Sequence, residues 1–368
     1  MKQDFVLRTI GILMQWDDDT ARREFAWLRL MSRMKYDDYQ EFLAGMRFVE
    51  SLADWLQQFK PEERKHAYDF IRSRLVFCSE PEMRHLAELL YPETLEPLIV
   101  ARTAKLAAVP RYRVWADSKA NALYKALLRK TVFMELSDGA RLDVFRRSNE
   151  GRVSNEQVVT APRINKSKWD DMLKELRNDL GESDAKFAFA VLVDDFTASG
   201  KTLFRFEDGR WKGKLQKFWD DLNEVGVIES HFENDWRLVV HHYLSTSQAV
   251  DAINESHKRK LTCTESDKWF NEVTFSYGSI LPPEIAVAKD KVPNFAKLVD
   301  DYYDKAVESQ HTQVGGDGVR WGFGNCALPL VLEHNTPNNT IALLWAETAG
   351  GNDTHAMRPL FRRRQRHV

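Results

Sequence analysis

The chain has 368 residues, 43% hydrophobic and 29% charged, which is enough to build two or three folded domains. Its 53 basic and 55 acidic side chains give a formal charge of −2, which argues against nucleic-acid binding through overall basicity. We expect a cytoplasmic protein, because the sequence shows no run near the roughly 20 apolar residues of a membrane span and no signal-peptide pattern. The widely spaced Cys78, Cys263 and Cys326 suggest reduced core thiols and neither a disulfide framework nor a zinc site.

Residues 1–108 are predicted to form an all-helical domain. Their apolar side chains, such as Phe25 and Leu28, recur at helical spacing, and Asp17 and Ser79 stand where helices would begin. The charged faces of these helices are expected either to be solvated or to include a surface that binds a protein.

Residues 109–290 alternate strands with helices, which predicts an α/β domain with a parallel sheet flanked by helices. The most apolar strand is 187–193, as expected for a strand covered on both faces. Further strands are expected at 131–136, 156–160, 236–243 and 273–277, and helices at 168–180, 214–225 and 247–256.

Residues 291–368 are expected to form a C-terminal extension, or hood. A helix is predicted at 293–309, with its proline in the first turn, and a glycine-rich loop at 314–324. The end of the chain is basic, and it could contact a phosphate backbone locally or serve only as a solubilising terminus. Its arginines are Arg358, Arg362, Arg363, Arg364 and Arg366.

The segment that carries chemistry follows the strand 187–193. It places Asp194 and Asp195 at the carboxyl end of a buried strand, where ligands of open α/β sheets bind. The backbone N–H groups of the next loop, together with the start of a helix, could hold a phosphate. The two carboxylates would repel that phosphate, so we expect them to bind sugar hydroxyls or a divalent cation. The loop consists of Thr197, Ala198, Ser199, Gly200, Lys201 and Thr202.

Two other interpretations of this segment are open. Residues 200–202 match the end of a nucleoside-triphosphate P-loop, but Asp195 stands where that motif requires its first glycine. The simpler alternative is that Asp194 and Asp195 only cap a helix.

The segment resembles the phosphoribosyl-pyrophosphate signature of type I phosphoribosyltransferases. The resemblance implies that Asp194 and Asp195 contact the ribose hydroxyls and help to place Mg²⁺, and that residues 197–202 hold the 5′-phosphate. The members that act on hypoxanthine and guanine have an aspartate where Ala198 stands here, whereas the adenine enzymes have alanine, which argues against the first pair of substrates.

A second short motif stands where this family has its pyrophosphate loop. The resemblance implies that Arg141 takes part in catalysis by neutralising the leaving pyrophosphate. The alternative is an ordinary turn, since Asp-Gly is common in turns. The resemblance also places a mobile lid at about 146–168. The predicted pyrophosphate loop consists of Ser137, Asp138, Gly139, Ala140 and Arg141.

The C-terminal segments 322–325, 333–340 and 343–345 resemble phosphoribosyltransferase-like proteins of bacterial anti-phage loci, including those that accompany retron reverse transcriptases. That resemblance implies an antiviral effector that binds phosphoribosyl pyrophosphate or a nucleotide with Mg²⁺. It also implies a protein partner at the N-terminal helices, such as a reverse transcriptase or a nucleoprotein. His334 could line the nucleobase side of the site or belong to a hydrogen-bonded turn.

The sequence therefore leaves two functions open. The first is a transferase that moves a pentosyl group, and the second is an inactive scaffold or ligand sensor that docks a partner. The adjacent His241 and His242 are expected to point to opposite faces of a strand, which makes a shared metal site improbable.

Overall fold

A computed structural model of the chain describes residues 3–42, 47–262, 269–270, 272–308, 318–351 and 355–363. Contacts within the chain divide it into two compact units, Met1–Glu82 with Pro282–Val368, and Met83–Leu281. These units differ from the three segments predicted from the sequence, because buried side chains of the first and last segments form one common core.

The unit Met83–Leu281 is built on a five-stranded parallel sheet in the order β3-β2-β4-β7-β8. The strands are β2 (Thr131–Glu135), β3 (Val158–Val159), β4 (Phe187–Thr197), β7 (Phe232–Thr246) and β8 (Val273–Leu281). All five predicted strands are present, β3 being shorter and β4, β7 and β8 longer than their apolar patterns indicated. The order of the strands reverses between β2 and β4, which is where ligands bind in sheets of this kind.

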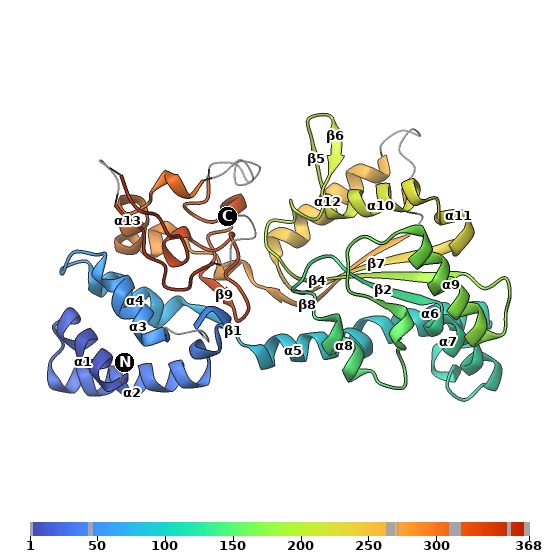
Figure 1. Ribbon diagram of the computed structural model, residues 1–368, viewed down its shortest axis with the longest axis horizontal. Coiled ribbons are helices and arrows are strands. Elements are labelled where there is room, and N and C mark those ends of the chain that lie inside the picture. The colour runs from blue at the N-terminus through green and yellow to red at the C-terminus, as the bar shows by residue number, and fades with distance from the viewer. Residues whose placement is uncertain are drawn as a thin grey trace. The chain divides into compact units, whose positions relative to one another are not determined.

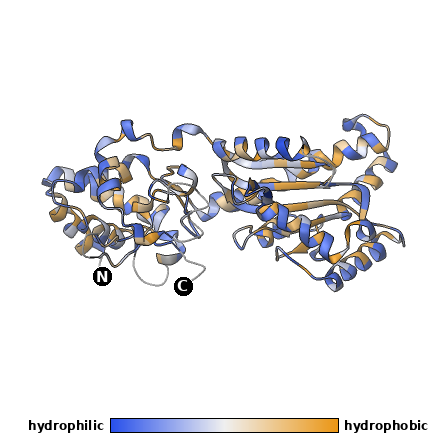
Figure 2. Cartoon of the chain, turned by 90° about the horizontal axis from the view of Figure 1, so that it is seen from above, coloured by the Kyte–Doolittle hydropathy of each residue, from blue (hydrophilic) through white to orange (hydrophobic). Residues whose placement is uncertain are grey.

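Helices cover both faces of this sheet (Figure 1), which confirms the predicted α/β class. One face packs against α9 (Lys166–Leu180), α10 (Lys214–Val225) and α12 (Ser247–Thr262) through a buried apolar cluster. The other face carries α6 (Glu96–Leu106), α7 (Ser118–Arg129) and α8 (Leu142–Ser148) (Figure 1). Figure 2 shows the hydrophobic strands between helices whose outward sides are hydrophilic. This region also contains α5 (Glu80–Leu89), a π-helical segment (Leu90–Leu95), α11 (Ile228–His231) and two short 3-10 helices (Arg111–Arg113 and Asn155–Gln157).

A two-stranded hairpin stands between the predicted phosphate loop and α10. Its strands, β5 (Arg205–Glu207) and β6 (Arg210–Lys212), are antiparallel. The hairpin packs on α12, where the Arg259 guanidinium lies 4.1 Å from the centre of the Phe206 ring. The expectation that the phosphate loop leads directly into a helix is therefore wrong.

The other unit joins both ends of the chain. Its elements are α1 (Gln3–Met14), α2 (Asp18–Met34), α3 (Phe48–Gln57), α4 (Arg64–Arg74), β1 (Val76–Cys78), α13 (Pro293–Asp301) and β9 (Leu330–Leu332). β1 pairs in parallel with β9, with Phe77 beside Val331, so the N-terminal region is not entirely helical as predicted. The helix α13 ends before residue 309, because the chain turns at Tyr302.

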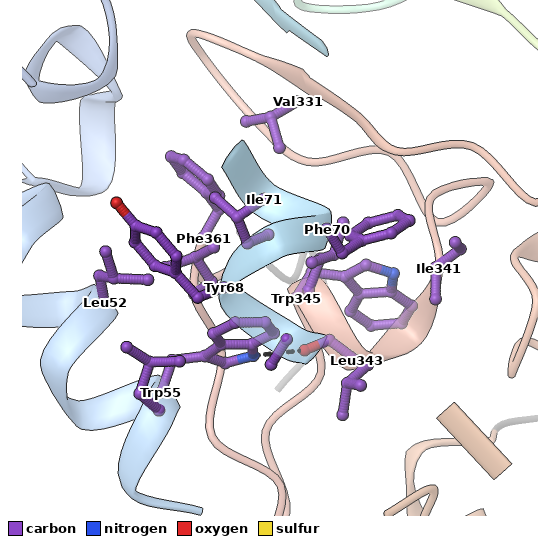
Figure 3. Close-up of a cluster of buried hydrophobic side chains, with 14 of the residues drawn as sticks. Leu52, Trp55, Tyr68, Phe70, Ile71, Val331, Ile341, Leu343, Trp345 and Phe361 are labelled. Carbon is purple, nitrogen blue, oxygen red and sulfur yellow. Dashed lines mark hydrogen bonds between the residues drawn. The ribbon is translucent and has the colours of Figure 1, made fainter. Parts of the chain in front are cut away.

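The core of this unit is assembled from segments that are far apart in the sequence. Figure 3 shows Leu52 and Trp55 packed with Leu343 and Phe361. The indole Nε1 of Trp55 donates a hydrogen bond of 2.8 Å to the carbonyl oxygen of Leu343. Within the described ranges, no helix is long and apolar enough to cross a membrane.

Candidate functional site

The structure brings the two predicted loops together at one edge of the sheet. Glu135, the last residue of β2, is paired in register with Val193 of β4. The backbone N–H of Leu136 then donates a 2.8 Å hydrogen bond to the carbonyl oxygen of Val193. The loop 137–141 therefore begins beside Asp194, at the point where the strand order reverses.

The two adjacent acids have different surroundings. Successive residues of a strand point to opposite faces, and here Asp194 is 3% exposed whereas Asp195 is half-buried. Asp194 Oδ1 accepts hydrogen bonds from Ser137 Oγ and from the backbone N–H of Asp195, the latter at 3.2 Å. Asp194 Oδ2 lies 2.5 Å from Lys214 Nζ. Asp195 Oδ1 accepts from the backbone N–H of Phe196 at 2.8 Å and lies 3.5 Å from Ser137 Oγ.

The carboxyl group of Asp194 is buried, and its pKa is raised above the usual value. Burial raises the pKa of its carboxyl group, while the Lys214 ammonium lowers it, the Asp195 carboxylate raises it further, and the Ser137 hydroxyl lowers it. The sequence did not identify Lys214, because it is 20 residues from Asp194 and beyond the hairpin. One signal was available: a lysine in the first turn of a helix opposes the helix dipole, so it needs another reason to be there.

The predicted phosphate loop is packed tightly against α12. Gly200 has a φ of +69°, and a Cβ atom added there would lie 3.1 Å from the carbonyl oxygen of Ala249 and 3.1 Å from Cγ1 of Ile253. The carbonyl oxygen of Ala198 accepts a 2.6 Å hydrogen bond from Thr246 Oγ1. Thr197, Ala198 and Ser199 are buried, Lys201 is half-buried and Thr202 is exposed. A side chain at position 200 would therefore be strained by the positive φ and would crowd α12.

The start of α10 is hydrogen-bonded to the end of the predicted phosphate loop. The backbone N–H groups of Lys214 and Leu215 donate to the carbonyl oxygens of Thr202 and Leu203, each at 3.0 Å. These two helix-terminal donors are therefore already bound within the protein. Any phosphate at this edge would depend on the N–H groups and hydroxyls of the loop itself.

The predicted pyrophosphate loop is a turn that leads into α8. The N–H of Ala140 donates to the carbonyl oxygen of Ser137 at 3.1 Å. Arg141 caps α8 with a φ of +49°, an uncommon conformation for a residue other than glycine and one found often at functional sites. The Glu135 carboxylate accepts a hydrogen bond of 3.2 Å from the backbone N–H of Leu142, and burial raises the pKa of Glu135.

His241 and His242 are buried neighbours on β7 with different partners. His241 Nδ1 lies 3.0 Å from Ser276 Oγ, whereas the His242 ring stacks on Tyr277 with ring centres 6.2 Å apart. Burial lowers their pKa values to about 4 and about 3, respectively. Both imidazoles are therefore neutral at physiological pH.

The described part of the chain contains no cluster of three or more His, Cys, Asp or Glu residues that could hold a metal ion. Mg²⁺ often needs no such cluster, because it is held by one or two carboxylates together with substrate phosphates and water. The half-buried Asp195 beside the phosphate loop fits that pattern. A magnesium ion at this edge would therefore be held jointly by protein and ligand.

The C-terminal candidate residues belong to the other unit. His334 Nδ1 lies 3.0 Å from Glu333 Oε1, and the N–H of Asn335 donates to the carbonyl oxygen of Leu332 at 3.1 Å, as in a hydrogen-bonded turn. Arg358 and Arg362 form exposed ion pairs, each at 2.7 Å. Residues 364–368, with the predicted contacts of Arg364 and Arg366, lie outside the described residues, as does Cys263.

Comparison with known proteins identifies one family. A family model described as PRTase-CE matches residues 52–363 of this chain. No curated protein and no solved structure matches the chain.

Proposed function

Since this chain belongs to the PRTase-CE family of phosphoribosyltransferase-like proteins, we propose that the edge formed by β2 and β4 binds 5-phosphoribosyl pyrophosphate or a related nucleotide together with Mg²⁺. The observation that carries the proposal is the meeting of the loop 137–141, the loop 197–202 and Asp195 where the strand order reverses. These are the groups that a phosphorylated ribose needs, namely amide and hydroxyl donors for phosphate and a carboxylate for hydroxyls.

The chain's own residues would divide the ligand between them. The N–H groups and hydroxyls of residues 197–202 would hold the 5′-phosphate. Asp195 would accept hydrogen bonds from the ribose hydroxyls and coordinate the metal ion together with the ligand. Mg²⁺ would supply positive charge to the pyrophosphate. Arg141 would stabilise that group further when its bond to C1 of the ribose breaks and the pentosyl group passes to an acceptor.

A second candidate is a ligand sensor without transfer activity. It is favoured by the ion pair of the buried Asp194 with the half-buried Lys214, because that pair occupies one of the two acids that the signature assigns to the ligand. An anti-phage role is a further proposal, and it rests only on the resemblance of the C-terminal segments. Phage challenge of bacteria that express the wild type or Asp195→Asn would test that role.

Calorimetric titration with phosphoribosyl pyrophosphate and Mg²⁺ tests the ligand. Wild-type protein is expected to bind, and Asp195→Asn is expected to lose at least about tenfold in affinity, since a charged hydrogen-bond partner is removed. The matched control is Asp184→Asn, the same change of charge at an exposed residue that precedes β4. Absence of binding by the wild type, or equal loss in both variants, would reject the proposed site. Release of pyrophosphate in an acceptor screen would then separate the transferase from the sensor.

A further inference from the structure

The two adjacent acids of the site do not face the same surroundings, and the difference assigns them different tasks. We propose that Asp195 is the carboxylate that contacts ligand, whereas Asp194 is a positioning residue that clamps the loop after β2 to the start of α10 through Ser137 and Lys214. The task of Asp195 rests on the proposed function. The clamp is a property of the protein without ligand.

The first step is that protein donors engage both oxygens of the Asp194 carboxyl group. An ionised carboxylate offers about four acceptor positions on its two oxygens. Ser137 Oγ and the N–H of Asp195 donate to Oδ1, and the Lys214 ammonium donates to Oδ2. With only 3% of Asp194 exposed and both oxygens engaged, this carboxyl group is poorly placed to meet a ribose hydroxyl or a cation.

The second step is the position of the two acids on the strand. Adjacent residues of a strand alternate between its two faces, and the Asp194 side chain lies on the face from which Lys214 approaches, while Ser137 Oγ at the end of the strand lies near both carboxyl groups. Asp195 is also the more exposed of the two. A ligand that approaches the carboxyl edge therefore meets Asp195 before Asp194.

The third step is that the clamp joins segments distant in sequence. Ser137 and Asp194 are 57 residues apart, and Asp194 and Lys214 are 20 residues apart. Lys214 makes two such contacts. Its side chain forms an ion pair with Asp194, and its backbone N–H donates a hydrogen bond to the carbonyl oxygen of Thr202 in the predicted phosphate loop. Loss of the ion pair should therefore loosen both loops of the site, although neither loop is itself altered.

The energetics of buried ion pairs supply a clean test. Removal of one partner leaves an uncompensated buried charge and is strongly destabilising, whereas neutral replacement of both partners is often tolerated. If Asp194 only positions the loops, the double replacement should restore both stability and ligand binding. If Asp194 contacts the ligand directly, the double replacement should not restore binding, because the contact would still be missing.

The experiment compares Asp194→Asn, Lys214→Met and the double variant with Asp195→Asn. Without ligand, each single clamp variant is expected to speed amide hydrogen exchange in residues 136–142 and 197–204 by at least about tenfold, and the double variant to recover most of it. Asp195→Asn keeps an acceptor oxygen near Ser137 and should speed this exchange less than either clamp variant. Should a single clamp variant fail to fold, Ser137→Ala, which removes one hydroxyl, should still speed exchange in residues 136–142.

Titration with phosphoribosyl pyrophosphate and Mg²⁺ completes the test. The double variant is expected to bind within about threefold of the wild type, whereas Asp195→Asn loses at least about tenfold. Additive exchange effects of the two clamp substitutions would overturn the clamp. A double variant with wild-type exchange but no binding would show that Asp194 contacts ligand. If the wild type itself does not bind, the proposed function fails, and the exchange experiments still decide the clamp.

Discussion

Asp194 of β4 and His242 of β7 are paired in register on adjacent strands, so a buried carboxylate and a buried imidazole lie side by side on one face of the sheet. Burial is the main reason why the pKa of His242 falls to about 3, and the charges of Lys214 and His241 lower it further while Asp195 opposes them. His242 therefore remains neutral next to the ion pair of Asp194 and Lys214.

This neutral histidine should make the stability of the protein depend on pH. In the unfolded chain a histidine has a pKa near 6.5, so between pH 6.5 and 3 the unfolded state takes up a proton that the folded state does not. The stabilising contribution of neutral His242 is complete above pH 6.5 and is lost as the pH falls. For this side chain alone, the loss between pH 7 and pH 5 is about 2 kcal/mol.

Urea unfolding of wild type and His242→Gln at pH 7 and pH 5 measures this contribution. The stability of the wild type relative to the variant should fall by about 2 kcal/mol between the two pH values. His85→Gln is the control, because the His85 side chain is 68% exposed on α5. If the difference in unfolding free energy between wild type and His242→Gln were the same at both pH values, the pKa of His242 in the folded protein would not be lowered.

The close packing of the phosphate loop on α12 predicts an unequal response of two glycines. Gly200 and Gly209 have φ values of +69° and +75°, but a Cβ atom would meet Ala249 and Ile253 only at Gly200, and nothing within 4 Å at Gly209. Gly209→Ala should therefore cost about 1 kcal/mol from backbone strain alone. Gly200→Ala should cost more and also weaken ligand binding by about tenfold, since it shifts the loop. Chemical unfolding and the same titration would measure both effects, and equal values for the two variants would refute the packing argument.

The elements that the sequence predicted best are those with a strong local pattern. The strand β4 was expected from its apolar run, and α10 and α12 from helical spacing. The hairpin after the predicted phosphate loop was not predicted, although the sequence carries a signal for it. Asp208-Gly209 is a dipeptide typical of a type I′ turn, and both residues have the positive φ that such a turn requires. The ion pair of Asp194 with Lys214 and the pairing of β1 with β9 are contacts between distant segments, which no local pattern encodes.

A buried arginine at the amino-terminal side of the sheet should matter for stability and not for the site. Arg102 of α6 is 3% exposed, donates to the carbonyl oxygen of Ala188 at 3.0 Å, and pairs with Glu233 and Asp235 at 2.8 and 3.0 Å. Arg102→Met should lower the free energy of unfolding by about 2 kcal/mol, because the carbonyl of Ala188 loses a buried donor and the partly buried Glu233 loses one of its two cations. Arg163→Met, at a side chain 59% exposed with two carboxylate partners, should cost less than about 1 kcal/mol. Similar losses of unfolding free energy in the two variants would contradict this account of burial.

The common core of the unit formed by both chain ends can be tested at Trp55. This indole is fully buried in α3, and its Nε1 donates to the carbonyl oxygen of Leu343, 288 residues away along the chain. Trp55→Phe should lower the free energy of unfolding by about 2 kcal/mol or more, because it leaves a cavity and a buried carbonyl without its donor. Trp115→Phe, at a side chain 49% exposed, is the matched control and should change stability by less than about 1 kcal/mol.

If the N-terminal and C-terminal segments folded separately, the loss of stability caused by Trp55→Phe would persist in a chain truncated before residue 282. If they share one core, that truncated chain should lose the cooperative unfolding of residues 48–77 even with Trp55 intact, which hydrogen exchange would detect.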